Sequence, residues 1–528
     1  MPRSVSEAAA PPNIVLLMAD QLTPFVLPFH GHPLVRTPAL SRLAAQGTVF
    51  DAAYCNFPIC APSRASMLSG RLPHDIGVFD NATEFPAEIP TIAHYLRAAG
   101  YRTILAGKMH FVGPDQLHGY EERLTTDIYP ADFLWVPDWS KGPEFRPTGV
   151  GMGHVVDAGP CVRNMQIDYD EETAHVAVQR IYDLARDGRK EPFFLTVSFT
   201  HPHPPFVARE EEWNAYADAD IDLPRTPEIP YAGLDPHSQW LHLAHGQDRH
   251  TVTSEHLRNA RRAYYAMVSY VDAKIGAVLA ALERSGLAED SVIVLCADHG
   301  EMLGERGMWY KQTFYEPSVR VPLVIRAPGV PPGRCGSVCS LVDLLPTCLD
   351  FAARGGRAVT PVDAPAGSSL VPLLHGDARG WRDEAVSEYS SEGVIAPSRM
   401  VRRGRWKYIV TLGLPPLLFD LESDPQELVN LAGEPRVADV EEELRTRLLA
   451  DWNPVEVDRR IRESQRRRLF LRAVAMQTGA FPPWNYEARP GDGQRFVRPA
   501  TASGPVGAKP RLRFPYVTPT PPDRTPES

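Results

Sequence analysis

The chain has 528 residues and a formal net charge of −10, from 55 Lys and Arg against 65 Asp and Glu. Nucleic acids and anionic membranes attract a basic field, so this acidic balance predicts neither partner. Seven cysteines are too few, and odd in number, for a disulfide scaffold. Their number therefore favours a reducing compartment.

The N-terminal segment is the first predicted element. Its apolar run, residues 14–19, is only six residues long, follows rather than precedes the small residues 8–10, and ends at Asp20. We interpret it as a buried strand and not as a signal peptide. No apolar run in the sequence is expected to approach the roughly 18 residues of a membrane helix, so the predicted location is cytoplasmic.

Short apolar runs then alternate with helical patterns. Strands are predicted at residues 14–19, 101–106, 192–199, 291–297 and 321–326, and helices at 38–46, 91–99, 173–186, 256–285 and 341–353. This alternation predicts an α/β fold, with a large, mostly parallel sheet sandwiched by helices.

The pattern changes after a Gly/Pro/Ala-rich loop at 354–367. Strand-like pieces at 400–410 and 417–421 and a helix at 437–452 predict a smaller C-terminal antiparallel sheet subdomain. A second helix, 455–477, carries a run of six arginines between residues 459 and 468, which we interpret as a solvated or subunit-facing side rather than an anion site. Residues 499–528 contain eight prolines and are expected to be disordered or to form an extended arm.

The most specific motif begins at Cys60 and reads CAPSRASMLSG up to Gly70. It resembles the sulfatase signature, in which the cysteine is converted to formylglycine. The resemblance implies a formylglycine-generating enzyme as a partner for maturation. It also implies that one hydroxyl of the hydrated aldehyde attacks sulfur, while loss of the other hydroxyl's proton expels sulfate. The alternative is a buried structural cysteine.

A second run, GYRTILAGKMH from Gly100 to His110, resembles the second sulfatase motif. The resemblance implies that Lys108 binds a sulfate oxygen and that His110 takes the proton from the second hydroxyl. By the same resemblance, His201 and Lys311 face the sulfate and the bridging oxygen, where a proton donor is worth roughly 10²–10⁴ in rate. Arg64 is expected to join Lys108 and Lys311 in holding the charged transition state.

Metal ligands are predicted where two strands end. Asp20 and Gln21 follow the first strand, and Asp298 and His299 follow the strand at 291–297. With the residue derived from Cys60, these groups suit one divalent cation. Mostly oxygen ligands favour Ca²⁺, Mn²⁺ or Mg²⁺, and the imidazole shifts the preference towards Mn²⁺. The alternative is an ordinary turn at Asp298.

Gln21 and His299 stand where many sulfatases have Asp and Asn. This pattern resembles the choline-sulfatase and phosphonate-monoester-hydrolase branch. Further runs resemble choline sulfatases in particular, and the resemblance covers residues 12–498. The runs are residues 111–130, 132–139, 297–307, 386–389 and 483–486.

This resemblance implies choline sulfate as the substrate and a homo-oligomer, either a dimer or a tetramer. A quaternary ammonium is held by aromatic faces and nearby carboxylates, at roughly 0.5–2 kcal/mol for each cation–π contact. Trp135, Glu388 and Asp492 are the predicted choline ligands, and Asn81 is predicted on the sulfate side. The resemblance implies that the tail carrying Asp492 comes from a neighbouring subunit.

The sequence therefore predicts an alkaline-phosphatase/sulfatase-like catalytic domain at 12–380 and a small α+β subdomain at 381–452. A helical tail for oligomerisation and pocket completion is predicted at 453–498, and a Pro-rich tail at 499–528. Two other functions stay open. One is a phosphonate or phosphate ester hydrolase, and the other is a non-catalytic protein that binds a sulfated osmolyte, should Cys60 remain unconverted.

Overall fold

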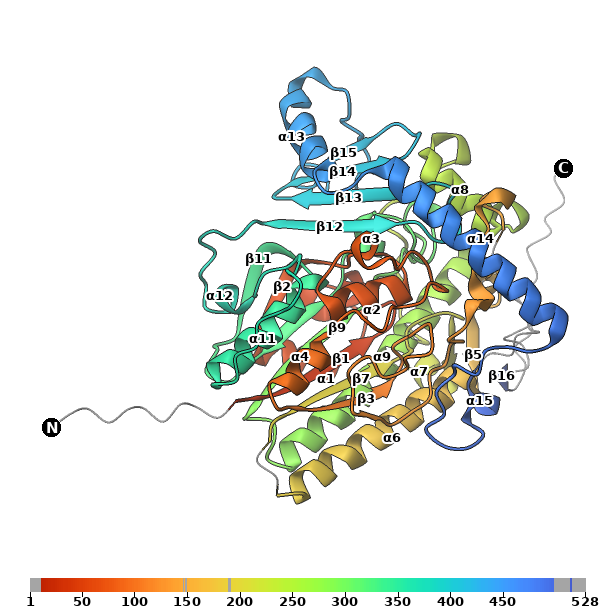
Figure 1. Ribbon diagram of the computed structural model, residues 1–528. Coiled ribbons are helices and arrows are strands. Elements are labelled where there is room, and N and C mark those ends of the chain that lie inside the picture. The colour runs from red at the N-terminus through yellow and green to blue at the C-terminus, as the bar shows by residue number, and fades with distance from the viewer. Residues whose placement is uncertain (1–10, 146, 148–149, 189–190, 498–512, 515–528) are drawn as a thin grey trace.

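The computed structural model describes residues 11–145, 147, 150–188, 191–497 and 513–514. Its centre is an eight-stranded sheet with the order β11-β2-β10-β9-β1-β7-β3-β4 (Figure 1). The strands are β1 (Asn13–Ala19), β2 (Thr48–Tyr54), β3 (Arg102–Gly107), β4 (Glu122–Arg123), β7 (Phe193–Phe199), β9 (Ser291–Ala297), β10 (Leu323–Arg326) and β11 (Gly333–Ser340).

The sheet confirms the predicted fold class. β1 pairs in parallel with both β7 and β9, and β3 pairs in parallel with β7. Every residue of β7 and β9 is buried, because helices cover both faces, and this is why these strands are continuous apolar runs in the sequence. The predicted strand at 321–326 is β10, which runs antiparallel to both of its neighbours.

Two groups of helices pack on the sheet (Figure 1). One group is α2 (Cys60–Ser69), α4 (Ile92–Ala98) and α11 (Leu344–Arg354), and the other is α1 (Pro38–Gln46), α6 (Met165–Arg186) and α9 (Ser254–Arg284). Helix α6 begins earlier than its apolar pattern predicts, because the Asn164 side chain accepts a hydrogen bond from the Ile167 amide and caps it. Helix α2 was not predicted from its Ser- and Pro-containing sequence.

Helix α9 corrects the expectation that no segment is long and apolar enough to cross a membrane. By length and composition Ser254–Arg284 meets that criterion, with a mean hydropathy of 1.4 over its most apolar window. However, 67% of that window is buried inside the protein, where α9 packs against α1 and α6. A core helix of a folded domain passes the same test.

The predicted small C-terminal sheet is confirmed. It is antiparallel and consists of β12 (Glu384–Tyr389), β13 (Ser398–Arg403), β14 (Trp406–Thr411) and β15 (Leu417–Asp420), with α13 (Ala438–Leu449) packed beside it. The predicted strand at 400–410 is the β13–β14 hairpin, which turns at Gly404 with a φ of 54°.

The Arg-rich helix is α14 (Pro454–Thr478), which runs across the molecule towards the C-terminal tail (Figure 1). Arg459 and Arg462 are solvated and pair with acids on their own helix. Arg468 is different, because it is buried and pairs with Asp80.

Shorter elements complete the described chain. They are α3 (Pro73–Ile76), α5 (Gly153–Val156), α7 (Glu210–Asn214), α8 (Pro236–His245), α10 (Glu316–Val319), α12 (Val371–Leu374), α15 (Asp492–Arg495), β5 (Gly159–Cys161), β6 (Arg163–Asn164), β8 (Val207–Arg209) and β16 (Arg513–Phe514). β16 pairs with β6, and the rest of the predicted Pro-rich tail lies outside the described residues.

Candidate active site

The predicted site residues come together at one edge of the sheet. Strands β9, β1, β7 and β3 are consecutive neighbours and run parallel, so their carboxyl ends meet there. Asp298 follows β9, Asp20 follows β1, His201 follows β7 by two residues, and Lys108 follows β3. Helix α2 presents Cys60, its first residue, to the same place.

Backbone geometry around these residues is tightly constrained. Gly107 has a φ of 94°, and a Cβ there would lie 1.9 Å from the Ser198 carbonyl oxygen, so only glycine fits. Gln21 and His110 also have positive φ values, of 65° and 56°, which are uncommon away from glycine. Asp127 holds the second of these turns by accepting the His110 amide hydrogen bond at 2.8 Å. Strained conformations of this kind gather at functional sites.

Four buried side chains form a candidate metal centre. One ligand atom each from Asp20, Cys60, Asp298 and His299 lies within 4.8 Å of the others. Cys60 Sγ is 3.3 Å from His299 Nε2 and 3.8 Å from Asp20 Oδ1. Burial lowers the pKa of His299 to about 3, so its imidazole is neutral. Since Nδ1 faces the Gly300 carbonyl at 3.1 Å, Nε2 keeps a lone pair for a cation. The donor set therefore fits a divalent ion.

Gln21 borders this cluster with its amide in a fixed orientation. Its Oε1 accepts a hydrogen bond from Lys311 Nζ at 2.6 Å, and its Nε2 donates to Glu301. Its backbone N–H donates to Asp298 Oδ1 at 3.0 Å. The carbonyl oxygen of the amide is thus turned towards the cluster. Glu301 was not among the predicted residues, although it follows Asp298 by three positions.

Arg64 binds the metal-site carboxylates. Its Nε donates to Asp298 Oδ2 at 2.8 Å and its Nη2 lies 3.7 Å from Asp20 Oδ2, while Nη1 donates to the Lys108 carbonyl. Although burial disfavours the charge, this guanidinium holds the pKa of Asp298 well below its usual range. The geometry supports a role in orienting the carboxylates, and the predicted role of Arg64 in holding sulfate stays a prediction.

The two lysines lie on the Cys60 side of the centre. Lys108 Nζ forms an ion pair with Asp20, and Lys311 Nζ is 3.4 Å from Cys60 Sγ. Even beside this ammonium, burial raises the pKa of the Cys60 thiol to about 11, so an unmodified thiol stays protonated at neutral pH. Together with Arg64, the two lysines give three cationic side chains around the carboxylates of Asp20 and Asp298. The excess positive charge favours the binding of an anion.

His110 is a neutral imidazole with open nitrogens. Burial and the neighbouring Lys108 charge lower its pKa well below 6.5. Among the described residues neither ring nitrogen has a hydrogen-bond partner, although both are buried. Its ring packs against Tyr129 and Trp135, at centroid distances of 4.9 and 5.6 Å. A buried imidazole in this state can accept a proton.

His201 is oriented by a carboxylate that sequence reasoning missed. Asp170, on α6, accepts from His201 Nδ1 at 2.6 Å and also from the backbone N–H groups of Thr200 and His201. The pairing leaves Nε2 to point away from α6. No spacing in the sequence links Asp170 to the loop after β7, because the contact depends on how α6 packs on the sheet.

The predicted substrate residues divide into two groups. Asn81 lies at the site, where its Oδ1 accepts the Ala61 amide hydrogen bond at 3.0 Å, and Trp135 lies beside His110. The carboxylate of Glu388 instead binds His74 Nδ1 at 2.6 Å and lies 3.4 Å from Arg399 Nε. Glu388 therefore has two basic neighbours, and its role as a choline ligand stays a prediction.

Asp492 is buried in the tail and serves a local turn. Its carboxylate accepts from the Arg489 amide at 2.9 Å and lies 3.4 Å from Arg495 Nη1. The tail itself packs on this chain's own site loop, because Asn485 Oδ1 accepts the Ala131 amide hydrogen bond and Phe496 lies in the same apolar cluster as Trp135. These contacts support a structural role for Asp492.

Comparisons with known proteins agree with this site. The Sulfatase family model matches residues 12–353, and the model of the N-sulphoglucosamine sulphohydrolase C-terminal region matches 304–453. The chain belongs to the sulfatase family, whose members hydrolyse sulfuric esters. The family implies a metal ion and a formylglycine in general, and a buried Asp/Cys/Asp/His cluster is present in this chain.

Individual proteins of the family are similar to this chain over most of its length. The chain is 43% identical to "Choline-sulfatase" of Rhizobium meliloti (strain 1021), over 92% of this chain and 96% of that protein. It is 30% identical to human "Arylsulfatase K", over 80% of each protein. Among solved structures, phosphonate monoester hydrolase of Agrobacterium radiobacter has a TM-score of 0.66 and 26% identity, covering 83% of this chain and 95% of that one.

Proposed function

We propose that the protein hydrolyses choline sulfate to choline and sulfate. The observation that carries this proposal is the aromatic wall beside the buried cationic centre. Tyr129 and Trp135 pack at a centroid distance of 4.9 Å, and both rings contact His110. An aromatic surface next to an anion-binding centre matches a substrate with a sulfate at one end and a quaternary ammonium at the other. The 43% identity to a choline-sulfatase supports the same substrate.

The acid that completes the choline site is proposed to be Glu392 in place of Glu388. Glu392 is 3% exposed, and burial together with the Asp80 charge raises its pKa, while the Lys311 ammonium opposes that rise. The loop that carries Glu392 lies beside the loop of Asn81, because the Ser390 hydroxyl donates a hydrogen bond to the Phe79 carbonyl at 3.0 Å. A bound quaternary ammonium would favour the ionised form of Glu392.

Asp20, Gln21, Asp298 and His299 are proposed to hold one divalent cation together with the residue derived from Cys60. We propose Ca²⁺ or Mn²⁺, with Mg²⁺ as the third candidate, because the donors are mostly oxygen with one imidazole. The bound cation supplies positive charge for the negative charge that develops on the sulfate. The formylglycine hydrate supplies the nucleophilic hydroxyl.

The chain's own residues then perform four tasks. Lys108 and Lys311 bind sulfate oxygens, and Arg64 keeps the two carboxylates in place through its 2.8 Å bond to Asp298. His110, neutral and without a hydrogen-bond partner among the described residues, accepts a proton at a ring nitrogen. His201, held by Asp170 at Nδ1, donates a proton from Nε2 to the choline oxygen as it leaves.

Assembly and maturation follow from the same proposal. We propose a homo-oligomer, a dimer or a tetramer, formed through the exposed apolar side chains of α14 and the segment after it. They are Phe470, Leu471, Val474, Met476 and Phe481, with exposed fractions of 68, 49, 40, 56 and 37%. We also propose a cytoplasmic location and a formylglycine-generating enzyme that converts Cys60 before or during folding.

A substrate panel tests the proposal. Purified, metal-loaded protein is offered choline sulfate, a simple alkyl sulfate, an aryl sulfate and a phosphonate monoester, after mass spectrometry has shown conversion of Cys60. We expect kcat/KM to be highest for choline sulfate. A higher value for the uncharged alkyl or aryl ester would refute the choline assignment.

The fold similarity to a phosphonate monoester hydrolase, with a TM-score of 0.66, favours a second candidate activity on phosphonate or phosphate esters. The same panel separates the two activities. Efficient turnover of the phosphonate ester without sulfate release from choline sulfate would favour this second activity.

A further inference from the structure

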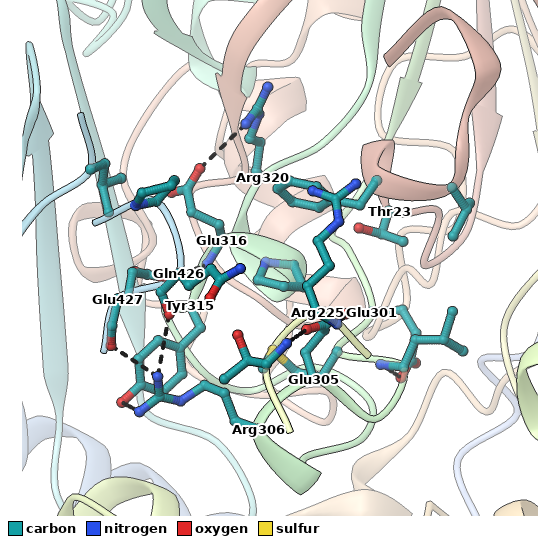
Figure 2. A pocket seen from close by; sticks show the side chains of 18 of the residues that line it. Thr23, Arg225, Glu301, Glu305, Arg306, Tyr315, Glu316, Arg320, Gln426 and Glu427 are labelled. Atoms are coloured by element: carbon teal, nitrogen blue, oxygen red, sulfur yellow. Dashed lines mark hydrogen bonds and ion pairs between the residues drawn. The ribbon is translucent and has the colours of Figure 1, made fainter. Parts of the chain in front are cut away.

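A second cavity lies between the catalytic layers and the small C-terminal sheet (Figure 2). It has a volume of about 260 Å³, and its walls come from the loop after β1, from helix α10 and from the segment after β15. None of the predicted catalytic, metal or substrate residues is among its described lining residues. The cavity is therefore distinct from the centre at Cys60, although it adjoins that centre through Glu301, which lines the cavity and accepts a hydrogen bond from Gln21.

Five arginines line this cavity, and three of them lack a carboxylate partner. Arg261 pairs with Asp222, and Arg320 lies 3.6 Å from Glu316. Within the described part of the chain, no ion pair involves the other three, Arg225, Arg306 and Arg402. Arg306 donates only to two backbone carbonyls and to the Tyr315 hydroxyl, and Arg402 Nε donates to the Tyr54 hydroxyl. Of the three, only Arg306 is buried, and a buried charge is normally paired.

The acids of the cavity already have other partners. Glu427 pairs with Lys407 at 2.7 Å. Glu305 accepts the backbone hydrogen bonds of Arg225 and Thr226, and Glu301 accepts those of Leu303 and Tyr310. These hydrogen bonds do not neutralise the carboxylates, but among the described residues none of them forms an ion pair with the three guanidinium groups.

Several polar atoms of the cavity wall also lack hydrogen-bond partners among the described residues. Thr23 is only 2% exposed, and its Oγ1 is unpartnered and points into the cavity (Figure 2). Arg306 Nε, in a residue that is 8% exposed, is unpartnered as well. So are the buried Arg320 Nε and Arg402 Nη1. Unmade hydrogen bonds at buried donors cost free energy, and an oxygen-bearing ligand would supply the acceptors.

The remaining wall is apolar and aromatic. The guanidinium groups of Arg225 and Arg320 lie over the Phe25 ring, at 5.5 and 5.2 Å from its centroid, and Val26 and Leu421 add aliphatic surface. The ligand therefore needs anionic oxygens and a small apolar body. We propose that this cavity binds a small organic carboxylate, independently of the catalytic centre.

Isothermal titration calorimetry of the full-length protein with benzoate tests the proposal, with benzamide as the neutral probe of the same shape. We expect saturable 1:1 binding of benzoate and none of benzamide. Arg225→Gln and Arg402→Gln should each weaken benzoate binding at least tenfold. Arg379→Gln is the matched control, because Arg379 is 91% exposed and pairs only with Asp377 in the described chain. This variant should bind benzoate with the affinity of the native protein.

Three results would overturn the proposal: no saturable benzoate binding, equal binding of benzamide, or unchanged benzoate affinity in both cavity variants. The last result would place the bound benzoate at the catalytic centre. Arg225→Gln keeps the test decisive even where Arg402→Gln fails to fold. Arg225 is exposed, and its guanidinium makes no hydrogen bond among the described residues, so its loss leaves the fold intact.

Discussion

The buried ion pair between Arg468 and Asp80 connects helix α14 to the catalytic centre. Arg468 donates two hydrogen bonds to Asp80, at 2.7 and 2.8 Å, and the two side chains are 6% and 0% exposed. The next residue, Asn81, accepts the amide hydrogen bond of Ala61, the neighbour of Cys60. We predict that Arg468→Met loosens this loop and, through it, the start of α2.

The cost follows from the charge that is left behind. Asp80 keeps one hydrogen bond, from the Ala82 amide at 2.9 Å, but loses its only counter-ion in the described chain. Removing one partner of a buried pair typically costs about 3–5 kcal/mol. Replacing both partners costs less, because no unpaired charge is left buried. The loss of unfolding free energy in the double variant Asp80→Asn/Arg468→Met should therefore be well below the sum of the losses in the two single variants.

Urea denaturation and hydrogen exchange measure the effect. We expect a lower unfolding midpoint for Arg468→Met and faster exchange of the Ala61 amide, together with a higher KM for choline sulfate. The control is Arg459→Met on the same helix, since Arg459 is 56% exposed and its pairs are worth about 0.3–0.5 kcal/mol each. Equal midpoints for Arg468→Met and Arg459→Met would refute the reasoning.

Four further outcomes are expected. Cys60→Ala should abolish turnover and leave the thermal unfolding curve unchanged, and residual sulfate release would contradict the role of Cys60. Glu301→Gln places an N–H opposite Gln21 Nε2, so we expect the Gln21 side-chain amide to flip. Metal retention after dialysis should then fall about 10–100-fold, and an unchanged metal content would argue against this. Glu392→Gln should raise KM for choline sulfate more than for an aryl sulfate, whereas Glu388→Gln should not distinguish the two esters. Burial opposes protonation of His74, but the Glu388 carboxylate raises its pKa above 6.5. The pair of His74 and Glu388 therefore stabilises the fold below about pH 6.5. This stabilisation is lost as the pH rises through the folded-state pKa of His74. Between pH 6 and 8, the unfolding midpoint should fall more in the native protein than in His74→Gln.

Much of the fold could be predicted because its signals are local. Buried parallel strands are continuous apolar runs, and helix α1 has the predicted bounds because Pro38 starts it and Gly47 follows it. The direction of β10 and the early start of α6 were not predictable in this way. The first depends on strand pairing with β2 and β9, and the second on a single Asn cap.

The candidate site shows the same division. Asp20 and Asp298 stand directly after apolar strands, so their meeting at one sheet edge follows from parallel topology alone. Asp170 and Glu301 act through packing and hydrogen bonds, and neither has a spacing that marks it. Glu388 was proposed from sequence similarity around it, yet β12 directs its side chain to His74 and Arg399.

The positions of Glu388 and Glu392 bear on how this chain could select its substrate. The catalytic groups lie on the central sheet, where strand order fixes them, but the candidate substrate groups lie on loops and on the small sheet. Three residues separate Glu388 from Glu392, and β12 ends between them at Tyr389, so the second acid lies beyond the end of the strand. On the proposed function, the preference of this chain for choline depends on an acid beyond the end of β12. Equal effects of Glu392→Gln on choline and aryl sulfates would show that the aromatic wall of Tyr129 and Trp135 selects choline without that acid.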